Sequence, residues 1–222
     1  GFYESDDFVN YEDDIYVGYR YFETVPGAAE KVNYPFGFGL SYTRFDVTDV
    51  RVCAEGDEIA VRADVTNAGG AAGKEVVQVY FSAPQGRLGR PARQLAGWRK
   101  TRLLQPGERQ RVEIRFPSGR MAAYDDLGKV RASAWLLEAG EYRFFVGTDV
   151  RSAAEVDFCW TLGETRVTEQ LTRRMAPTQL EKRMLADGSF EPLPTAAPFD
   201  TDANLLAPMT HEECEGMHPA TR

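Results

Sequence analysis

Alternation of apolar and polar residues with a period of two recurs along the middle of this chain, and it limits the fold more than any other feature. In EIAVRADVTN, residues 58–67, Ile59, Val61 and Ala63 share one face, while charged and hydroxyl side chains share the other. ERQRVEIRF, residues 108–116, alternates in the same way. Because successive side chains of a β-strand point to opposite faces, each segment predicts a strand that buries one face in a core.

Three more segments predict strands: KEVVQVYFS at 74–82, EYRFFVG at 141–147 and AEVDFCWTL at 154–162. The first is largely apolar on both faces, so it is expected to be covered on both sides. In FDVTDVRV, residues 45–52, the apolar phase slips between Val47 and Val50. That slip predicts a bulge or bend in the strand.

Turn-forming residues join these segments at NAGGAAG (67–73), QPGE (105–108), LGK (127–129) and LEAGE (137–141). Glycine, proline and asparagine at such joints favour tight reversals of the chain. No amphipathic segment of helix length interrupts the series. The pattern therefore predicts an all-β fold, a β-sandwich of about seven antiparallel strands over roughly residues 45–163.

The composition excludes several classes of partner. Of the 222 residues, 43% are hydrophobic, enough for one core of good size, and the formal net charge of -8 opposes the phosphate backbone of nucleic acid. No apolar run is long enough to cross a membrane, so no membrane partner is predicted. The three cysteines, Cys53, Cys159 and Cys214, fit neither a disulfide framework nor a zinc site. Their odd number slightly favours a reducing, cytoplasmic compartment.

The two ends of the chain lack the strand pattern. The chain begins in mid-pattern with Gly1, which suggests a piece of a longer protein, and residues 1–33 carry acidic and aromatic side chains without a hydrophobic face. We expect this stretch to lie as a surface segment over another body. After Gly163, TRVTEQLTRRM (165–175) and TQLEKRML (178–185) predict two short helices, and the remainder predicts an extended tail.

The stretch YPFGFGLSYTRF, residues 34–45, crowds aromatic rings and glycines together just before the first strand. The rings need burial, whereas Gly37 and Gly39 disfavour a regular helix or strand. We interpret the stretch as a joint whose rings, including Phe38 and Tyr42, pack where the sandwich meets a neighbouring body. Without that body, several of the rings are expected to be exposed.

A candidate metal site lies near the end of the chain, where His211 and His218 flank Glu212, Glu213 and Cys214. These side chains can ligate a metal, but their spacing matches no closed tetrahedral pattern and no rigid scaffold is predicted around them. We interpret the segment as a solvated tail, and no metal-binding residue is assigned.

Acidic clusters give no better candidate for acid-base catalysis. Glu12, Asp13 and Asp14 are adjacent and point in different directions, without a hydrophobic pocket to separate their pKa values. A solvated or ion-paired loop is expected there, and a turn is expected at Asp125 and Asp126.

Nucleophilic and phosphate chemistry are also unsupported. Ser41 has no histidine near it in the sequence, so a nucleophile elbow is not indicated. Gly37 and Gly39 do not fit the spacing of a phosphate-binding loop. No catalytic residue, no cofactor-binding residue and no cofactor is therefore predicted.

A series of strings in fixed order carries a resemblance to a known family: YEDDIYVGYRYFET (11–24), YPFGFGLSYTRF (34–45), VTNAGGAAGKEVVQVYFSAP (65–84), RPARQLAGWRKTRLLQPGE (90–108) and LEAGEYRFFVGTDVR (137–151). Together they resemble the C-terminal part of glycoside hydrolase family three, which includes β-glucosidases and β-xylosidases. The resemblance covers roughly residues 11–160.

The resemblance implies a TIM-like barrel, an α/β sandwich domain and a fibronectin type III-like sandwich. Residues 1–43 are then expected to be a C-terminal remnant of the α/β sandwich domain with the aromatic joint. Residues 44–163 would form the immunoglobulin-like, fibronectin type III-like β-sandwich, and residues 164–222 a tail or linker. Because some members place the barrel after these domains, the tail is either a connection to a downstream barrel or a C-terminal extension.

The resemblance also implies the chemistry of a retaining β-glycosidase that hydrolyses terminal β-glucosides or β-xylosides. Such an enzyme uses an Asp nucleophile on the barrel and a Glu acid/base on the α/β sandwich domain, and no residue of this chain matches either motif. The implied partners are the barrel and the α/β sandwich domain of the same protein, with an oligo- or aryl-β-glycoside as its substrate. The domain in this chain is expected to be structural, and inactive alone.

Two other functions stay open. A stand-alone carbohydrate-binding module could stack sugars on Trp98, Trp135 or Tyr80, whereas the opposing interpretation places these rings in the sandwich core. A protein-interaction sandwich is the third hypothesis, and only the acidic composition supports it.

Overall fold

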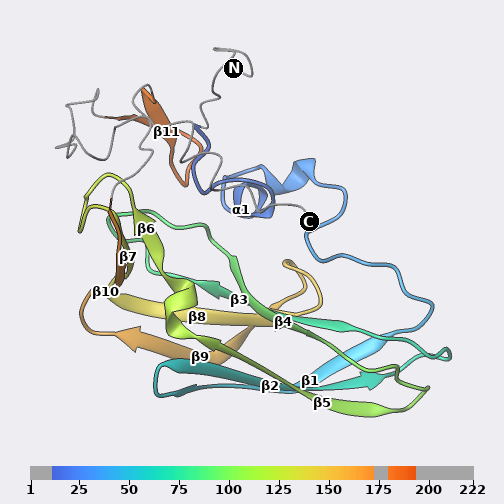
Figure 1. Ribbon diagram of the computed structural model, residues 1–222. Coiled ribbons are helices and arrows are strands. Elements are labelled where there is room, and N and C mark those ends of the chain that lie inside the picture. The colour runs from blue at the N-terminus through green and yellow to red at the C-terminus, as the bar shows by residue number, and fades with distance from the viewer. Residues whose placement is uncertain (1–11, 173–179, 194–222) are drawn as a thin grey trace, which may run out of the picture.

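The computed structural model describes residues 12–172 and 180–193, and its centre is a two-layered β-sandwich (Figure 1). One layer is an antiparallel sheet of β1 (Phe45–Glu55), β2 (Glu58–Asn67) and β5 (Arg109–Pro117), in the order β1-β2-β5. The other layer has the order β4 (Gln94–Lys100), β3 (Val76–Ser82), β8 (Gly140–Gly147), β9 (Ala154–Leu162). The predicted all-β sandwich is confirmed, with three strands facing four.

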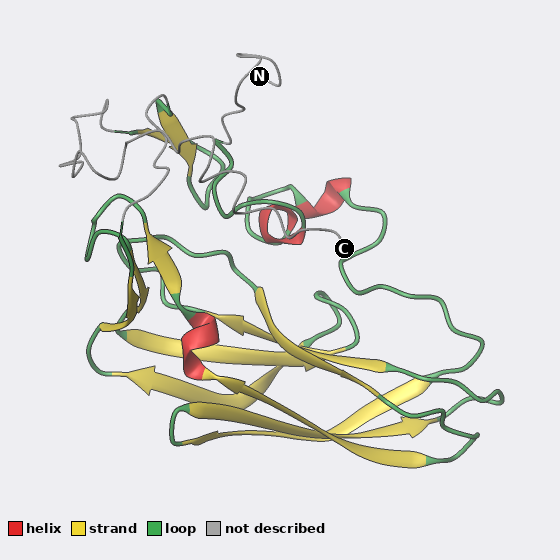
Figure 2. Ribbon diagram, in the orientation of Figure 1, coloured by secondary structure: helices red, strands yellow, loops and turns green. Residues whose placement is uncertain are grey.

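Smaller elements surround the sandwich (Figure 2). A short sheet has the order β10 (Arg166–Gln170), β7 (Ala134–Leu137), β6 (Ala123–Asp125), and a hairpin is formed by β11 (Lys182–Met184) and β12 (Phe190–Pro192). The helical pieces are single turns: α1 (Tyr19–Phe22), η1 (Ala29–Lys31) and η2 (Ser118–Met121).

The core lies between the two layers and follows the predicted alternation. Val61 and Val65 of β2 and Val112 and Phe116 of β5 are at most 2% exposed. The inward residues of β8 are also buried, and those of β9 are partly buried against the same core: Tyr142, Phe144, Val146, Val156, Phe158, Trp160 and Leu162. Burial of each large apolar side chain contributes roughly 1.5–3 kcal/mol, so this alternation is the main source of stability.

The predicted irregularity in the first strand is a β-bulge. The pairing of β1 with β2 shifts register between Thr48 and Arg51. Asp49, inside the shift, has a φ of 51°, in the left-handed region. An extra residue in one strand of an antiparallel pair accounts for the slip in the apolar phase.

The two helices predicted after Gly163 are wrong. Residues 166–170 form β10, which pairs with β7 from Arg166 opposite Leu137, and residues 182–184 form β11. β-branched residues at Val167 and Thr168 suit a strand, and β7 offers backbone groups that need partners. Pairing with a neighbouring strand therefore overrides a weak helical pattern.

The division of the chain at residues 43 and 163 stays a prediction.

The strand predicted to be covered on both sides is β3, and this prediction is confirmed. Val77, Val79 and Phe81 face the core, and Tyr80 on the opposite face is equally buried. Residues 16–38 of the N-terminal segment cover that outer face, where Figure 1 shows α1 on the side of β3 away from β2 and β5.

Specific contacts attach the N-terminal segment to the outer face of β3 and its neighbours. The ring of Tyr19 meets that of Tyr80 edge to face at 6.2 Å, and the Tyr19 hydroxyl accepts the N–H of Leu95 at 2.9 Å. The N–H of Val150 donates to the carbonyl of Phe36 at 2.9 Å. The four-stranded sheet is therefore packed on two faces, as its sequence requires.

One carboxylate is buried on the sheet of β1, β2 and β5. Asp64 on β2 accepts two hydrogen bonds from Arg111, each 2.8 Å long, and a further one from Arg109. These hydrogen bonds hold the pKa of Asp64 well below its usual range. The ionised form is thus favoured by the fold, and it stabilises the pairing of β2 with β5.

Replacing Gly37 by alanine tests the close approach of the N-terminal segment to β3. A Cβ there would lie 2.5 Å from the amide nitrogen of Gln78, at a φ of +89° that suits glycine. We expect Gly37→Ala to lower the free energy of unfolding by about 2 kcal/mol in urea titrations. Gly39→Ala is the matched control, because nothing lies within 4 Å of its Cβ position. Equal effects of the two changes would contradict this packing.

Replacing Asp64 by asparagine tests the buried carboxylate. Because the folded-state pKa is depressed, the contribution of Asp64 is present above the unfolded pKa of about 3.9 and is lost as the pH falls toward the folded value. Asp64→Asn should therefore lower the urea midpoint at pH 7 and weaken its decline below about pH 4. Asp46→Asn, in an exposed pair with Arg44 at 3.8 Å, should leave both nearly unchanged. An unaltered acid dependence in Asp64→Asn would refute the assignment.

Candidate functional site

The seam, defined here as residues 34–45, presents aromatic and aliphatic side chains to solvent. Leu40 and Tyr42 are almost fully exposed, and Tyr34, Phe36 and Phe38 are exposed by more than two fifths. Tyr34 pairs with Phe38 at a centroid distance of 4.9 Å, a contact within the seam itself. The prediction that several of these rings would be exposed is confirmed.

Only the inner side of the seam is packed. The ring of Phe36 stacks on Tyr19 at 4.5 Å, and the backbone at Gly37 lies directly against Gln78. The outer side therefore carries exposed apolar groups on a backbone that is held in place. Exposed apolar side chains gathered in one segment are typical of interaction sites.

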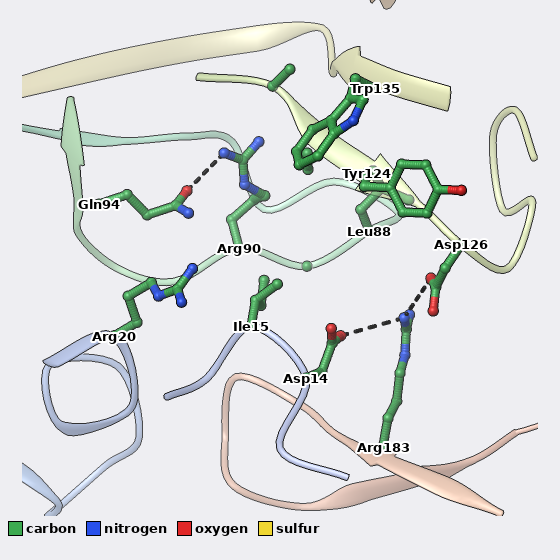
Figure 3. Close-up of a pocket in the computed structure, with 13 residues that line it drawn as sticks. Asp14, Ile15, Arg20, Leu88, Arg90, Gln94, Tyr124, Asp126, Trp135 and Arg183 are labelled. Atoms are coloured by element: carbon green, nitrogen blue, oxygen red, sulfur yellow. Dashed lines mark hydrogen bonds and ion pairs between the residues drawn. The ribbon is translucent and has the colours of Figure 1, made fainter. Parts of the chain in front are cut away.

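A cavity of about 360 Å³ lies beside the small sheet of β6 and β7 (Figure 3). Its walls come from the N-terminal segment, the loop before β4, the strands β6 and β7, and the β11–β12 hairpin. The lining residues are Asp14, Ile15, Arg20, Leu88, Gly89, Arg90, Gln94, Ala122, Ala123, Tyr124, Asp126, Trp135 and Arg183.

Two aromatic rings form one wall of the cavity. Tyr124 on β6 and Trp135 on β7 are directly opposite each other in the antiparallel pair. Their centroids are 5.5 Å apart with an interplanar angle of 51°, and both rings are partly exposed. The pairing of the two strands therefore fixes an aromatic surface at the mouth of the cavity.

Arg90 forms the inner wall and is only 1% exposed. Its Nη2 donates to Oε1 of Gln94 at 2.7 Å and to the carbonyl of Met121 at 2.8 Å. Its Nε and Nη1 are buried and have no hydrogen-bond partner among the described residues. Burial lowers the pKa of Arg90, but a guanidinium group still carries its charge at neutral pH. A positive charge therefore lies behind the cavity.

Arg183 of β11 forms the outer wall with the groups that bind it, a set named here the Arg183 network. Its guanidinium lies 3.5 Å from a carboxylate oxygen of Asp14, 3.2 Å from Asp126 and 2.7 Å from Glu191. Lys129 also donates to Glu191 at 2.7 Å. The network joins the N-terminal segment, the loop after β6 and the β11–β12 hairpin.

The network changes the titration of its carboxylates in opposite directions. Burial raises the pKa of Asp14, although the nearby Arg183 charge partly offsets this effect. The hydrogen bond from Lys129 lowers the pKa of Glu191 despite some burial. Both carboxylates turn toward Arg183, and each is an ion-pair partner of that guanidinium.

The acidic candidates from the sequence lie where loops and turns were expected. Glu12 lies 3.5 Å from Lys182, and Asp14 belongs to the Arg183 network, so the ion-paired loop is confirmed. Asp125 accepts the backbone N–H groups of three residues in the following turn, Lys129, Val130 and Arg131. Both groups of acids stabilise local structure.

Other candidates are exposed or cannot be placed. Ser41 is exposed, and its hydroxyl accepts the N–H of Thr43 at 3.2 Å. The candidate metal ligands His211, Glu212, Glu213, Cys214 and His218 lie outside the described residues. Within residues 12–172 and 180–193, no group of three or more His, Cys, Asp or Glu could hold a metal. No helix in those ranges has the length or apolarity needed for a bilayer crossing.

The three rings considered for sugar stacking differ in their surroundings. Tyr80 is fully buried, as the core interpretation requires, whereas Trp98 is 62% exposed and Trp135 is 40% exposed. The core interpretation is therefore wrong for the two tryptophans. Only Trp135 lines the cavity. Arg90 and Arg183 were missed in the sequence, because a single arginine has no spacing to other residues that would point to a site.

Comparison with known proteins shows that this chain is similar to part of several β-glucosidases. Residues 75–150 match the fibronectin type III-like domain family. Beta-glucosidase A of Butyrivibrio fibrisolvens is 54% identical over 221 residues, which cover 93% of this chain and 27% of that protein.

Solved structures give the same result. A β-glucosidase from Paenibacillus barengoltzii has a TM-score of 0.73 at 45% identity, covering 82% of this chain and 21% of that chain. A GH3 β-glucosidase of Bifidobacterium adolescentis has a TM-score of 0.59 at 35% identity, covering 67% of this chain and 21% of that chain. The chain thus spans about a quarter of the length of the relatives it matches.

Replacing Arg183 by methionine tests whether the Arg183 network holds the hairpin in place. The change keeps an unbranched side chain but leaves Asp14, Asp126 and Glu191 as neighbouring carboxylates without their shared cation. We expect the hairpin to lose about 2 kcal/mol of local stability, since Arg183 is buried while its partners are partly solvated. Hydrogen exchange at the N–H of Met184, which donates to the carbonyl of Glu12 at 2.9 Å, should become faster.

Lys182→Met is the matched control, because Lys182 is the neighbouring cation and lies in a more exposed pair. It should change this exchange rate little. If both variants accelerate exchange equally, the Arg183 network does not hold the hairpin.

Proposed function

We propose that the chain is a β-glucosidase-like segment of glycoside hydrolase family three that carries a fibronectin type III-like domain, and that it stabilises the catalytic body of a retaining β-glycosidase. That body would hydrolyse terminal β-glucosides or β-xylosides. The segment itself would have no hydrolytic activity and would act by packing its seam against the catalytic body. The exposed seam is the observation on which the proposal rests.

The carboxylates of the described residues support an inactive segment. A retaining glycosidase needs two carboxyl groups about 5–5.5 Å apart, one as nucleophile and one as acid/base. In the cavity, the carboxylates of Asp14 and Asp126 both bind Arg183, which keeps them as ion-pair partners.

The seam supports the docking role through the number and position of its exposed groups. Leu40 and Tyr42 project from a backbone that is fixed on one side by Phe36 and Gly37. Burying one such side chain against another body contributes roughly 1.5–3 kcal/mol. Because the backbone of the seam is already held in place, little chain entropy is lost on docking, which also favours binding.

The substrate class follows from the relatives alone. The relatives described above are named as β-glucosidases, and the cited GH3 member shares the sandwich at 35% identity. A β-glucoside is therefore the first substrate to test, and a β-xyloside the second. The catalytic barrel and the α/β sandwich domain are the proposed partners of the seam.

An activity assay tests the proposal. The 222-residue chain should release no product from aryl β-glucosides or aryl β-xylosides, whereas the longer protein that contains it should be active. Hydrolysis by the chain alone, or an inactive longer protein on every β-glycoside, would overturn the proposal.

A substitution in the seam tests the docking role separately. Leu40→Ser should lower the melting temperature of the longer protein by about 3 °C while leaving that of the 222-residue chain unchanged. Leu103→Ser is the matched control, since Leu103 is also exposed but lies outside the seam. If the two substitutions have the same effect in the longer protein, the seam does not dock.

A further inference from the structure

We propose that the cavity between Trp135 and Arg90 binds one end of a neutral saccharide, which would give this segment a sugar-binding site of its own. The inference goes beyond the proposed structural role, because that role needs only the seam. It rests on the size of the cavity, its aromatic wall and the mixture of hydrogen-bonding groups on its other walls (Figure 3).

The dimensions suit a ligand of one or two sugar rings. The cavity encloses about 360 Å³, which lies in the range of pockets that bind small molecules. Its walls come from segments that are far apart in the sequence, including Ile15, Leu88 and Trp135. Such a site is formed by the tertiary fold, so its shape is set before a ligand arrives.

The aromatic wall supplies a surface for the apolar face of a sugar ring. Trp135 and Tyr124 are held 5.5 Å apart by the pairing of β7 with β6. One face of a pyranose carries C–H groups, and these pack against the electron-rich face of an aromatic ring. Because both rings are partly exposed without a ligand, covering them removes apolar surface from water.

The remaining walls carry both donors and acceptors, which sugar hydroxyls require. Arg20 and Gln94 supply donors, and the amide of Gln94 can also accept. Asp14 and Asp126 supply acceptors, since a carboxylate has about four acceptor positions and the contact with Arg183 occupies few of them. Each hydroxyl of a sugar both donates and accepts, so a mixed lining fits it better than a lining of one kind.

The charges of the lining favour a neutral ligand over an anion. Three guanidinium groups, Arg20, Arg90 and Arg183, face two carboxylates, Asp14 and Asp126. Because the positive and negative charges of the lining nearly balance, a strongly charged ligand gains little net attraction. The buried charge of Arg90 behind the cavity still attracts the oxygen atoms of hydroxyl groups, because charges act strongly where water is excluded.

Titration of the 222-residue chain with cellobiose and with glucose, followed by tryptophan fluorescence and calorimetry, tests the proposal. We expect cellobiose to bind with a dissociation constant of about 1 mM. Trp135→Ala should weaken binding about tenfold, because it removes the stacking surface. Trp98→Ala is the matched control, since Trp98 is also exposed but does not line the cavity, and it should bind normally.

A second variant protects the test against misfolding. If Trp135→Ala fails to fold, Arg20→Gln removes a charged donor from the opposite wall and should weaken binding about threefold. Inorganic phosphate serves as the anionic probe and should not compete with cellobiose. Three results would overturn the proposal: no binding of either sugar up to about 20 mM, equal losses in the two tryptophan variants, or displacement of cellobiose by phosphate.

Discussion

The packing of the N-terminal segment on the outer face of β3 is the constraint on which the rest of the structure depends. A strand with Tyr80 on one face and Phe81 on the other can be stable only if both faces are covered. The sheet of β1, β2 and β5 covers one face, and residues 16–38 cover the other. This second layer holds the backbone at Gly37 against Gln78 and so fixes the position of the seam. The seam projects its rings because its inner side is already packed.

The same N-terminal segment also creates the cavity. Asp14 and Arg20 belong to it, and they face Trp135 and Arg90 of the sandwich region. Arg183 closes the outer wall from a hairpin that follows the sandwich in the sequence. Two surfaces with different properties therefore arise from one packing event: an apolar seam that suits a protein partner, and a polar cavity with an aromatic wall that suits a small ligand.

The sequence was sufficient for the elements whose stability comes from regular alternation. The buried faces of β2 and β5, the double coverage of β3 and the bulge near Asp49 could all be predicted, because each is set by the positions of apolar residues. β10 could not, since its strand conformation depends on pairing with β7 and its own residues are exposed. The cavity was missed for a related reason: its lining residues come from five separate stretches, and neither Arg90 nor Arg183 belongs to a sequence motif that points to a site.

The central claim is that the seam packs against a catalytic body, and surface labelling of tyrosine measures this most directly. Hydroxyl-radical footprinting should modify Tyr42 readily in the 222-residue chain, where its ring is fully exposed. In the longer protein the same ring should be protected, while Tyr124, outside the seam, should be labelled equally in both. Equal labelling of Tyr42 in the two proteins would contradict the account, because the seam would then have no partner.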